Sequence, residues 1–306
     1  MEIFILERQS VIDVGSNTIH LLVAEVGDGE VLPVTAEKFS ARLGAGVEKS
    51  GKLKEERLEL AADAIGFFSR IAGLNGAPGP TILATSAVRD SKNGQELIER
   101  VREITGLGMR LISGEEEAEL GFRGAVSAVG ATAWEGPALV VDLGGGSAQL
   151  IVGEASSGPL MQVSLPLGSN RTTERFVGHD PAKKKELRAL DQHVKEMMPG
   201  WSLASRVPVV AVGGSARAMV KITRDKLTLG RMRELAEEVC EVPSAVVARE
   251  NGLAPERTRV LPAAITTLAA ILEHFEKPEL TVARGGLREG TVLALAAGEL
   301  EREEKS

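Results

Sequence analysis

The sequence predicts an α/β fold made of two related domains, and three observations carry this prediction. Strand-like and helix-like segments alternate along the chain, a pattern typical of sheets covered by helices. A glycine-containing hairpin pattern occurs twice, once near the N-terminus and once near the middle of the chain. The length of 306 residues also fits two domains of ordinary size.

The first domain is expected over residues 1–125 and opens with three strands. The first two strands, at 11–15 and 19–26, flank a Gly-Ser-Asn turn, and the third follows at 31–39. The stretch 53–73 predicts a long amphipathic helix because its apolar residues recur at helical spacing. The next elements are expected as strand 81–85, helix 94–105, strand 109–112 and helix 115–129.

The second domain is expected over residues 126–287, with the small-residue stretch 130–137 near its start. Its opening hairpin repeats the first one, with strands at 139–143 and 149–154. Residues 288–306 are expected to pack back on the first domain. The other elements are expected as helix 181–197, strand 207–212 with a helix after it, helices 231–239, 244–249 and 260–275, strand 280–282 and helix 286–303.

Composition removes several classes of protein from consideration. One cysteine, Cys240, excludes an internal disulfide framework and a thiolate metal cluster. Four histidines argue against a histidine-rich metal site, and 3% aromatic residues argue against a base-stacking platform for single-stranded nucleic acid. The net charge of −7 argues against a general nucleic-acid binder. No segment reads as a signal peptide or a membrane span, so a cytoplasmic protein is expected.

The negative net charge hides a basic stretch in the middle of the chain. Residues 160–235 carry 14 basic and 7 acidic side chains, whereas residues 1–150 carry 14 and 22. A local positive excess indicates either a site for an anionic ligand or a solvated helical face around lysines 183–185. Charge alone favours the solvated face.

The repeated hairpin is the most informative feature of the sequence. Residues 11–25 align without gaps to residues 140–154, an offset of 129 residues, and six of the 15 positions are identical. Each copy places an aspartate, Asp13 or Asp142, two residues before a glycine. Backbone N–H groups in such a turn bind anions, and a neighbouring carboxylate is suited to hold Mg²⁺. One such turn is most often a plain hairpin, but two matched copies favour a phosphate site.

Three further segments carry groups suited to phosphate chemistry. Residues 213–215 join an apolar strand to a helix, whose free N–H groups would bind phosphate, with a plain strand–helix junction as the alternative. Arg89 follows a strand and can bind two phosphate oxygens, unless it pairs with Asp90. Glutamates 115–117 begin a helix, where they also favour the helix dipole. The chain shows no P-loop, zinc-protease or α/β-hydrolase motif.

Together these motifs resemble the Ppx/GppA family of exopolyphosphatases and guanosine pentaphosphate phosphohydrolases. The resemblance implies an actin-like fold, shared with sugar kinases and Hsp70 and similar to RNase H, with two duplicated domains and an interdomain cleft. It also implies Mg²⁺-dependent removal of the terminal phosphate of a polyanion by direct attack of water, with Mn²⁺ as the alternative metal. The motifs are Val-Ile-Asp-Val-Gly-Ser-Asn-Thr at 11–18, Ala-Thr-Ser-Ala-Val-Arg-Asp at 84–90, Ile-Ser-Gly-Glu-Glu-Glu-Ala at 112–118, Val-Val-Asp-Leu-Gly-Gly-Gly-Ser at 140–147, Val-Gly-Gly-Ser-Ala-Arg at 212–217 and Gly-Gly-Leu-Arg-Glu-Gly at 285–290.

The resemblance also assigns roles to individual residues. It implies that Glu117, rather than Glu115 or Glu116, is the general base, and that Arg89 clamps the scissile phosphate. It implies a metal held by Asp142, with Glu117 and Asp13 as further ligands. The phosphate-binding residues that it implies are Gly15, Ser16, Asn17, Arg89, Gly144, Gly145, Gly146, Ser147, Gly213, Gly214, Ser215 and Arg217.

Two features depart from the family pattern. The family usually has a glutamate two residues after the serine of the second glycine motif, where this chain has Gln149. An amide cannot be an anionic metal ligand or a base, so we predict weaker Mg²⁺ binding or a ligand set built on Asp142 and Glu117. Long family members add a C-terminal helical domain, which this chain is expected to lack. We therefore expect short polyphosphate chains as preferred substrates.

The expected function is an exopolyphosphatase, with a guanosine pentaphosphate phosphohydrolase as the nearest alternative. Two further alternatives are an ATP-dependent kinase of the same fold and a non-catalytic regulator that binds polyphosphate or a nucleotide. No nucleic-acid or membrane partner is expected. Helices 231–249 and 260–275 would serve either as a homodimer interface or, by preference, as core. A path for polyphosphate would be lined by Arg171, Lys183, Lys184, Lys185, Arg188, Arg217 and Lys221.

Overall fold

The computed structural model describes residues 8–27, 29–130 and 136–300. The chain divides into two compact units, unit 1 with Met1–Gly130 and Gly285–Ser306, and unit 2 with Ala131–Arg284. Both boundaries fall just outside helices, since α5 spans Gly114–Val129 and α12 spans Leu287–Ala296. The predicted boundaries, 125/126 and 287/288, instead cut into these two helices. No helix within the described ranges is both long and apolar enough to cross a membrane.

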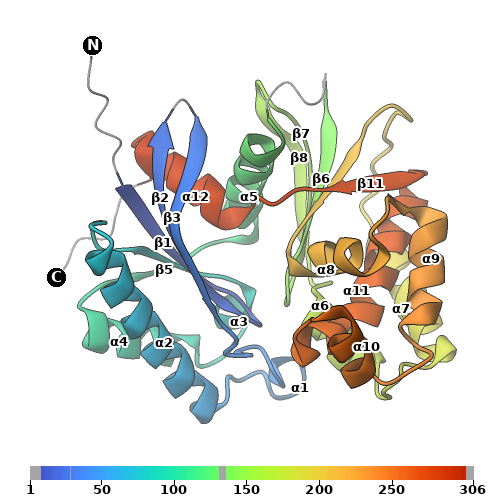
Figure 1. The fold of residues 1–306 in the computed structure, drawn as a ribbon, viewed down its shortest axis with the longest axis horizontal. Helices are drawn as coiled ribbons and strands as arrows, with labels where there is room; N and C mark the ends of the chain where they lie inside the picture. Colours follow the sequence, from blue (N-terminus) through green and yellow to red (C-terminus); the bar gives the residue numbers. More distant parts are fainter. Residues whose placement is uncertain (1–7, 28, 131–135, 301–306) are drawn as a thin grey trace. The chain divides into compact units, whose positions relative to one another are not determined.

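Unit 1 is a five-stranded sheet with helices on both faces (Figure 1). The strand order is β3-β2-β1-β4-β5, in which β1, β2 and β3 are antiparallel neighbours and β4 and β5 run parallel to β1. One face packs on α2 and α4, and the other packs on α5 and α12. The remaining bounds are β1 Arg8–Val14, β2 Ile19–Gly27, β3 Glu30–Phe39, α1 Val47–Ser50, α2 Glu55–Leu74, β4 Thr81–Ala84, α3 Ser86–Arg89, α4 Gly94–Thr105 and β5 Met109–Leu111.

Strand β1 carries the apolar residues Val11, Ile12 and Val14 in its second half, where it is buried on both faces. Ile12 and Val14 pack into the core that includes Leu58 and Ile65 of α2. Val11 points to the opposite face, into the core that includes Leu287 and Val292 of α12. Alternate side chains of a strand point to opposite faces, so a central strand covered on both sides needs apolar residues at successive positions.

Unit 2 is a six-stranded sheet in the order β10-β11-β9-β6-β7-β8. Leaving out the short β10, this order repeats that of unit 1, with the same antiparallel meander followed by parallel strands. The predicted duplicated α/β fold is therefore confirmed. The bounds are β6 Ala138–Leu143, β7 Ala148–Glu154, β8 Gly158–Leu165, α6 Ser169–Phe176, α7 Lys184–Met197, β9 Val209–Val212, α8 Gly214–Thr223, β10 Leu227–Thr228, α9 Leu229–Glu238, α10 Ser244–Asn251, α11 Pro255–His274 and β11 Glu279–Val282.

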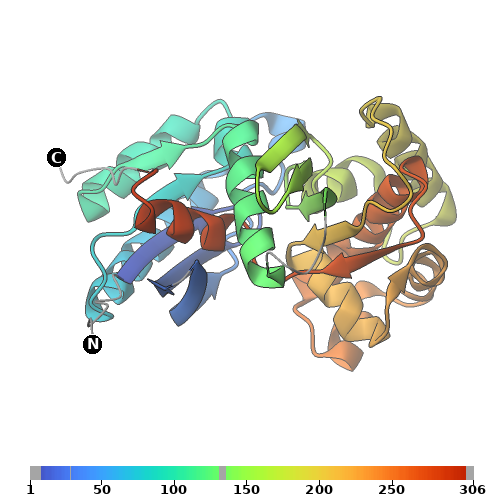
Figure 2. The same ribbon diagram turned by 90° about the horizontal axis from the view of Figure 1, so that it is seen from above.

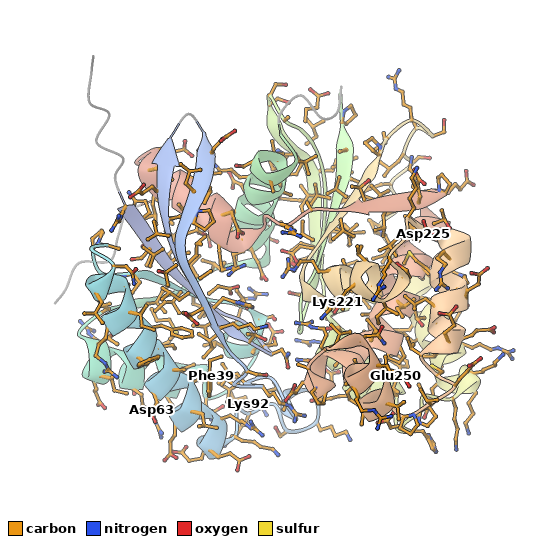
Figure 3. All side chains as sticks on the ribbon, viewed as in Figure 1. Phe39, Asp63, Lys92, Lys221, Asp225 and Glu250 are labelled. Carbon is orange, nitrogen blue, oxygen red and sulfur yellow. The ribbon has the colours of Figure 1, made fainter. Side chains whose placement is uncertain are left out.

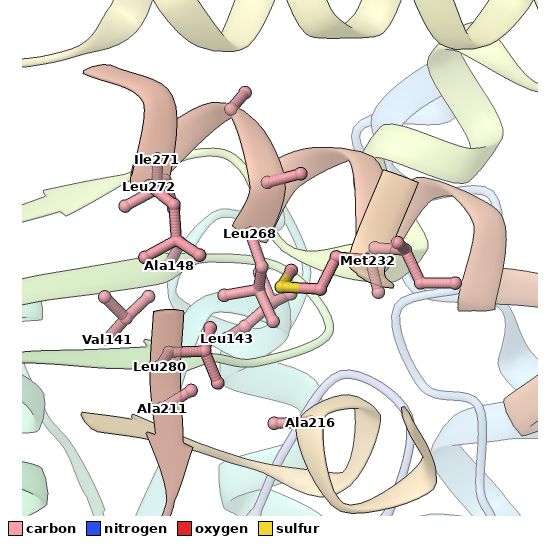
Figure 4. Close-up of a cluster of buried hydrophobic side chains, with 14 of the residues drawn as sticks. Val141, Leu143, Ala148, Ala211, Ala216, Met232, Leu268, Ile271, Leu272 and Leu280 are labelled. Carbon is pink, nitrogen blue, oxygen red and sulfur yellow. The ribbon is translucent and has the colours of Figure 1, made fainter. Parts of the chain in front are cut away.

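The core of unit 2 is organised around helix α11. Its residues Leu268 and Ile271 lie over the strand residues Val141 and Leu143, and Met232 of α9 closes the cluster (Figure 4). The predicted helices 231–249 and 260–275 thus supply core residues, as the preferred interpretation held. Helix α11 starts at Pro255, five residues before the predicted start at 260, with the proline in the first turn, where its missing N–H costs nothing.

Two elements of unit 2 lie in a stretch for which no element was predicted. Strand β8 and helix α6 lie between the predicted strand 149–154 and the predicted helix 181–197. The residues of β8 are only partly buried and show no clean alternation, and α6 is eight residues long, so neither has a strong periodic signal. The basic helix α7 begins at Lys184, three residues after its predicted start.

Helices α5 and α12 of unit 1 cross with their backbones in contact (Figure 2). A Cβ atom added at Gly124 would lie 1.9 Å from the Gly286 carbonyl oxygen, and one added at Gly290 would lie 1.8 Å from the Leu120 carbonyl oxygen. A Cβ atom at Gly285 would lie 2.1 Å from the Gly124 carbonyl oxygen. The glycines of the 285–290 motif are therefore required for close helix packing, which attaches the end of the described chain to unit 1.

Candidate functional site

The first glycine turn is held in place by hydrogen bonds from three neighbouring segments. The Gly15 N–H donates to the Thr18 carbonyl (3.3 Å), which closes the turn between β1 and β2. The Ser16 hydroxyl lies 3.2 Å from the Ser86 hydroxyl in a buried position at the start of α3. Both the backbone N–H and the hydroxyl of Thr85 donate to the Val14 carbonyl. The first and second motifs of the sequence thus meet at the carboxyl ends of β1 and β4.

A loop after β3 packs against the outside of this turn. The Arg42 N–H donates to the Asn17 carbonyl (2.9 Å) and the Gly44 N–H donates to the Ser16 carbonyl (2.8 Å). A Cβ atom at Gly44 would lie 3.0 Å from the Ser16 Cβ, so glycine permits this approach. Arg42 has a φ angle of +50°, a left-handed conformation that is rare for a residue with a side chain. The sequence motifs gave no signal for this loop.

Arg89 and Glu117 form an ion pair in unit 1. The Arg89 Nη1 lies 3.3 Å from Glu117 Oε2 and donates to the Ile112 carbonyl at 2.8 Å, while Asp90 is more distant, at 3.7 Å. Glu117 is buried in the first turn of α5. Arg89 thus pairs with Asp90, as the alternative interpretation expected, and in addition with Glu117.

The three glutamates that begin α5 have three different environments. Glu116 accepts the Ser113 backbone N–H in a capping box and pairs with Arg110. This backbone hydrogen bond, followed by the Arg110 charge, holds the pKa of Glu116 below its usual value against the opposing effect of burial. Glu115 is exposed. Among the three, only Glu117 is buried beside an arginine.

The second glycine turn has the same closing hydrogen bond as the first. The Gly144 N–H donates to the Ser147 carbonyl (3.0 Å), between β6 and β7. The first residues of α6 pack on the turn: the Asn170 N–H donates to the Gly145 carbonyl (2.8 Å), and Arg171 Nε donates to the Gly146 carbonyl (2.8 Å). In both hydrogen bonds a backbone carbonyl of the turn is the acceptor. The contact of Arg171 with the turn is therefore a structural one.

Gln149 is enclosed beside this turn. Its side chain is 1% exposed, and its amide nitrogen donates to the Ser147 hydroxyl at 2.8 Å and to the Ser164 hydroxyl at 3.2 Å. It stands opposite Asp142 in the β6–β7 ladder, as His20 stands opposite Asp13 in unit 1. The amide therefore orients a serine hydroxyl of the turn.

The third glycine segment lies directly beside the second. Gly213 has a φ angle of +103°, and a Cβ atom there would lie 2.8 Å from the Leu143 carbonyl oxygen and 3.5 Å from Asp142 Oδ1. Gly214 and the fully buried Ser215 begin helix α8. Within unit 2 the structure thus brings together Asp142, its turn and the N-terminus of α8, as the motifs indicated.

Arg257 is a residue of this cluster that sequence reasoning missed. Its Nη1 donates to the Ser215 hydroxyl at 3.3 Å, and a Cβ atom at Gly214 would lie 2.5 Å from its Nη2. Burial of the guanidinium, and after it the like charge of Arg217, lower the pKa of Arg257. Two neighbouring guanidinium groups at a helix N-terminus form a strongly positive environment, which an anion would neutralise. No motif pointed to Arg257, because it begins a different helix, 42 residues away from Ser215.

The other basic residues predicted to line a path for polyphosphate make local contacts. Lys184 pairs with Glu237 at 3.0 Å across helices α7 and α9, and the Lys221 ammonium donates to the Gly252 carbonyl at 2.6 Å. Arg188 lines a groove of about 740 Å³ between α7 and α9, together with Asp191 and Arg233. Such contacts are typical of basic side chains on a helix surface.

A magnesium ion would find a suitable donor set in unit 2. Among the described residues, no group of three or more His, Cys, Asp and Glu side chains could by itself hold a metal ion. Mg²⁺ does not need such a cage, because it commonly binds one or two carboxylates and completes its shell with water and substrate phosphates. Asp142 beside the Gly213 backbone fits that arrangement.

The fold and the two matching turns define a protein of duplicated α/β architecture. The Ppx/GppA phosphatase family matches residues 22–299. The chain therefore belongs to the Ppx/GppA phosphatase family and is a hydrolase, as the resemblance implied.

Two curated proteins are similar to this chain. The chain is 28% identical over 303 residues to exopolyphosphatase 1 of Mycobacterium leprae. The matched region covers 94% of this chain and 88% of that protein. It is 38% identical over 194 residues to an uncharacterised protein of Streptomyces coelicolor, covering 62% of this chain and 56% of that protein.

Solved structures agree as well. The family member of Aquifex aeolicus has a TM-score of 0.79 at 25% identity, covering 97% of this chain and 99% of that one. The exopolyphosphatase of Cytophaga hutchinsonii has a TM-score of 0.86 at 25% identity, and the match covers 95% of this chain and 98% of that one.

Proposed function

We propose that this protein is an exopolyphosphatase that removes the terminal phosphate of short inorganic polyphosphate chains. The observation that carries the proposal is that each unit has a closed glycine turn with charged side chains near it. In unit 1 the turn contacts Ser86 of α3, the helix that also carries Arg89 of the Arg89–Glu117 pair. In unit 2 the turn follows Asp142, which lies beside Gly213, and α8 begins there close to Arg257. The named relatives of the chain, exopolyphosphatases, support this choice of substrate over guanosine pentaphosphate.

In the proposed reaction, Glu117 accepts a proton from the attacking water. The water oxygen forms a bond to the terminal phosphorus, and the bridging P–O bond breaks. The shortened chain leaves with a negative charge on its new terminal oxygen. Phosphoryl transfer depends mainly on positioning and charge neutralisation, which the backbone turns and Arg89 are suited to provide. Mg²⁺ held by Asp142 would neutralise phosphate charge when bound.

The decisive experiment measures phosphate release from short polyphosphate, guanosine pentaphosphate and ATP, each with Mg²⁺. We expect release from polyphosphate to be the fastest. Glu117→Ala should lower kcat on the order of 10² to 10⁴-fold, the usual contribution of a general base. The matched control is Glu115→Ala, which removes an exposed carboxylate from the same helical turn and should leave kcat unchanged.

Each outcome distinguishes between the candidate functions. Full activity in a folded Glu117→Ala protein would exclude Glu117 as the base. Faster release from guanosine pentaphosphate would identify the nucleotide as the substrate. Transfer of the ATP phosphate to an acceptor other than water would indicate a kinase. Polyphosphate binding without phosphate release would indicate a regulator.

A further inference from the structure

The carbonyl groups of the second glycine turn are bound by the start of helix α6. The Ser169 N–H donates to the Gly144 carbonyl at 2.9 Å. The Arg171 N–H donates to the Gly145 carbonyl at 3.2 Å, and Arg171 Nε donates to the Gly146 carbonyl at 2.8 Å. The first N–H groups of a helix have no partner inside the helix, and here the turn supplies their acceptors. Three consecutive carbonyls of the turn therefore point toward α6.

The direction of these carbonyls also fixes the direction of the turn's N–H groups. In a planar trans peptide, the C=O and the N–H point in opposite directions. Because carbonyls 144–146 point toward α6, the N–H groups of residues 145–147 point away from it. Within the part of the chain that the structure describes, none of these three N–H groups donates to a backbone carbonyl. Successive N–H groups on one side of a turn form a concave site for an anion.

Gly168 lets α6 approach the turn this closely. A Cβ atom there would lie 2.3 Å from the Gly146 carbonyl carbon and 2.4 Å from the Gly145 carbonyl carbon. The φ angle of Gly168 is −61°, a value that residues with side chains readily adopt. Glycine is therefore needed here for the close contact with the turn and not for the backbone conformation.

The first turn is held in a similar way by the loop after β3. This loop follows Phe39, the last residue of β3 (Figure 3). The N–H groups of Arg42 and Gly44 donate to the carbonyls of Asn17 and Ser16, and a Cβ atom at Gly44 would lie 3.0 Å from the Ser16 Cβ. In each unit, the segment after the third strand, β3 or β8, thus binds turn carbonyls and places a glycine against the turn.

We propose that residues 168–171, which we call the α6 clamp, hold the second glycine turn in the orientation that binds phosphate. Arg171 is a positioning residue: it acts through the Gly146 carbonyl that it binds and not as a ligand of the phosphate. The loop after β3 has the corresponding role for the first turn. The inference rests on the proposed function for the identity of the anion, and it adds the residues that keep the turn's N–H groups directed at that anion.

Titration of the full chain with inorganic phosphate, followed through the NMR signals of the backbone amides, tests the α6 clamp. In the wild type, the amide signals of residues 145–147 should shift as phosphate binds. Gly168→Ala should weaken this binding by at least about tenfold, because the methyl group displaces the Gly145–Gly146 peptide. The matched control is Gly200→Ala, since a Cβ atom at Gly200 meets nothing within 4 Å and should not change the affinity.

Substitution of Arg171 separates positioning from charge. Arg171→Lys keeps the positive charge but has no N–H group in the place of Nε. Both Arg171→Lys and Arg171→Ala should therefore weaken phosphate binding at residues 145–147 by about tenfold, the effect of one lost charged hydrogen bond. Arg175→Ala, which removes an exposed arginine one turn further along α6, is the control and should have no effect. Wild-type affinity in Arg171→Lys would show that charge alone matters and would overturn the positioning role.

The remaining outcomes distinguish this inference from the proposed function. The Arg171 variants should melt at the wild-type temperature, so that a weaker affinity is not a consequence of unfolding. Wild-type amides at 145–147 that do not respond to phosphate, or clamp variants that bind as the wild type does, overturn the inference. If these amides respond in a protein that releases no phosphate from polyphosphate, the proposed function fails and the α6 clamp stands.

Discussion

At the scale of single residues, the site depends on how similar side chains are given different surroundings. Glu115, Glu116 and Glu117 are consecutive, yet one is exposed, one caps a helix and one is buried against Arg89. The sequence favoured Glu117 only through a family resemblance, because three adjacent glutamates look alike in a linear pattern. The distinction comes from the helix, which turns about 100° per residue and so points the three side chains in different directions.

The first prediction at this scale concerns Gln149. Gln149→Glu adds a negative charge next to Asp142 while keeping the size of the side chain. We expect Mg²⁺ to bind more tightly, by roughly tenfold, because a carboxylate attracts the ion where an amide does not. The serine hydroxyls that now accept from the amide would rotate and donate to the carboxylate.

Two measurements check this prediction. Calorimetric titration of Mg²⁺ without substrate reports the affinity directly, and phosphate release reports the Mg²⁺ concentration for half-maximal activity. Gln192→Glu, which adds the same charge on the exposed side of α7, is the control and should change neither value. An unchanged or weakened Mg²⁺ affinity in Gln149→Glu would refute a metal-ligand role for this position.

At the scale of elements, the contact between α5 and α12 depends on glycine. Gly290→Ala would place a methyl group 1.8 Å from the Leu120 carbonyl oxygen, so the helices must separate. We expect a loss of about 1–3 kcal/mol in the free energy of unfolding, as for an overpacked core. At about 2–4 °C per kcal/mol, the melting temperature should fall by several degrees.

Gly73 of α2 is the matched control for this substitution. It is also a helical glycine, but a Cβ atom there meets nothing within 4 Å. Gly73→Ala should therefore leave the melting temperature unchanged or raise it, because alanine favours the helix by about 0.5–1 kcal/mol. Equal melting temperatures for the Gly290→Ala protein and the wild type would show that the helix crossing is not rigid.

Sequence patterns predicted elements well where periodicity was strong and poorly where it was weak. The two hairpins and the parallel strands were found because they are continuous apolar runs next to turn residues, and α2 was found because its apolar residues recur at helical spacing. Strand β8 and helix α6 were missed, because a half-exposed edge strand and a short helix bury few residues. Arg257 was missed for a different reason: its approach to Gly214 is a tertiary contact between α8 and α11, and local pattern carries no information about it.

At the scale of the whole molecule, the duplication explains why the two glycine turns stand out in the sequence. The two units repeat one strand order, and the turns after β1 and β6 are closed by the same hydrogen bond. Their surroundings have diverged, since unit 1 supplies the Arg89–Glu117 pair while unit 2 supplies Arg257 and Arg217. The repeat therefore predicts where ligands bind in each unit but not which side chains complete the site.

The distribution of charge over the molecule leads to the last prediction. The basic stretch of unit 2 contains both Arg217, beside Arg257, and lysines 183–185, of which Lys184 pairs with Glu237. Arg217→Ala should raise KM for polyphosphate by about tenfold to a hundredfold at every chain length, because charged hydrogen bonds contribute about 1.5–3 kcal/mol.

Reversing all three lysines to glutamate changes the net charge from −7 to −13, six units, yet charges farther than about 10 Å from the ligand are screened at 0.1 M salt. We therefore expect the triple reversal to leave the ratio of KM values for long and short chains unchanged. A selective rise in KM for long chains would instead show that these lysines guide polyphosphate along unit 2.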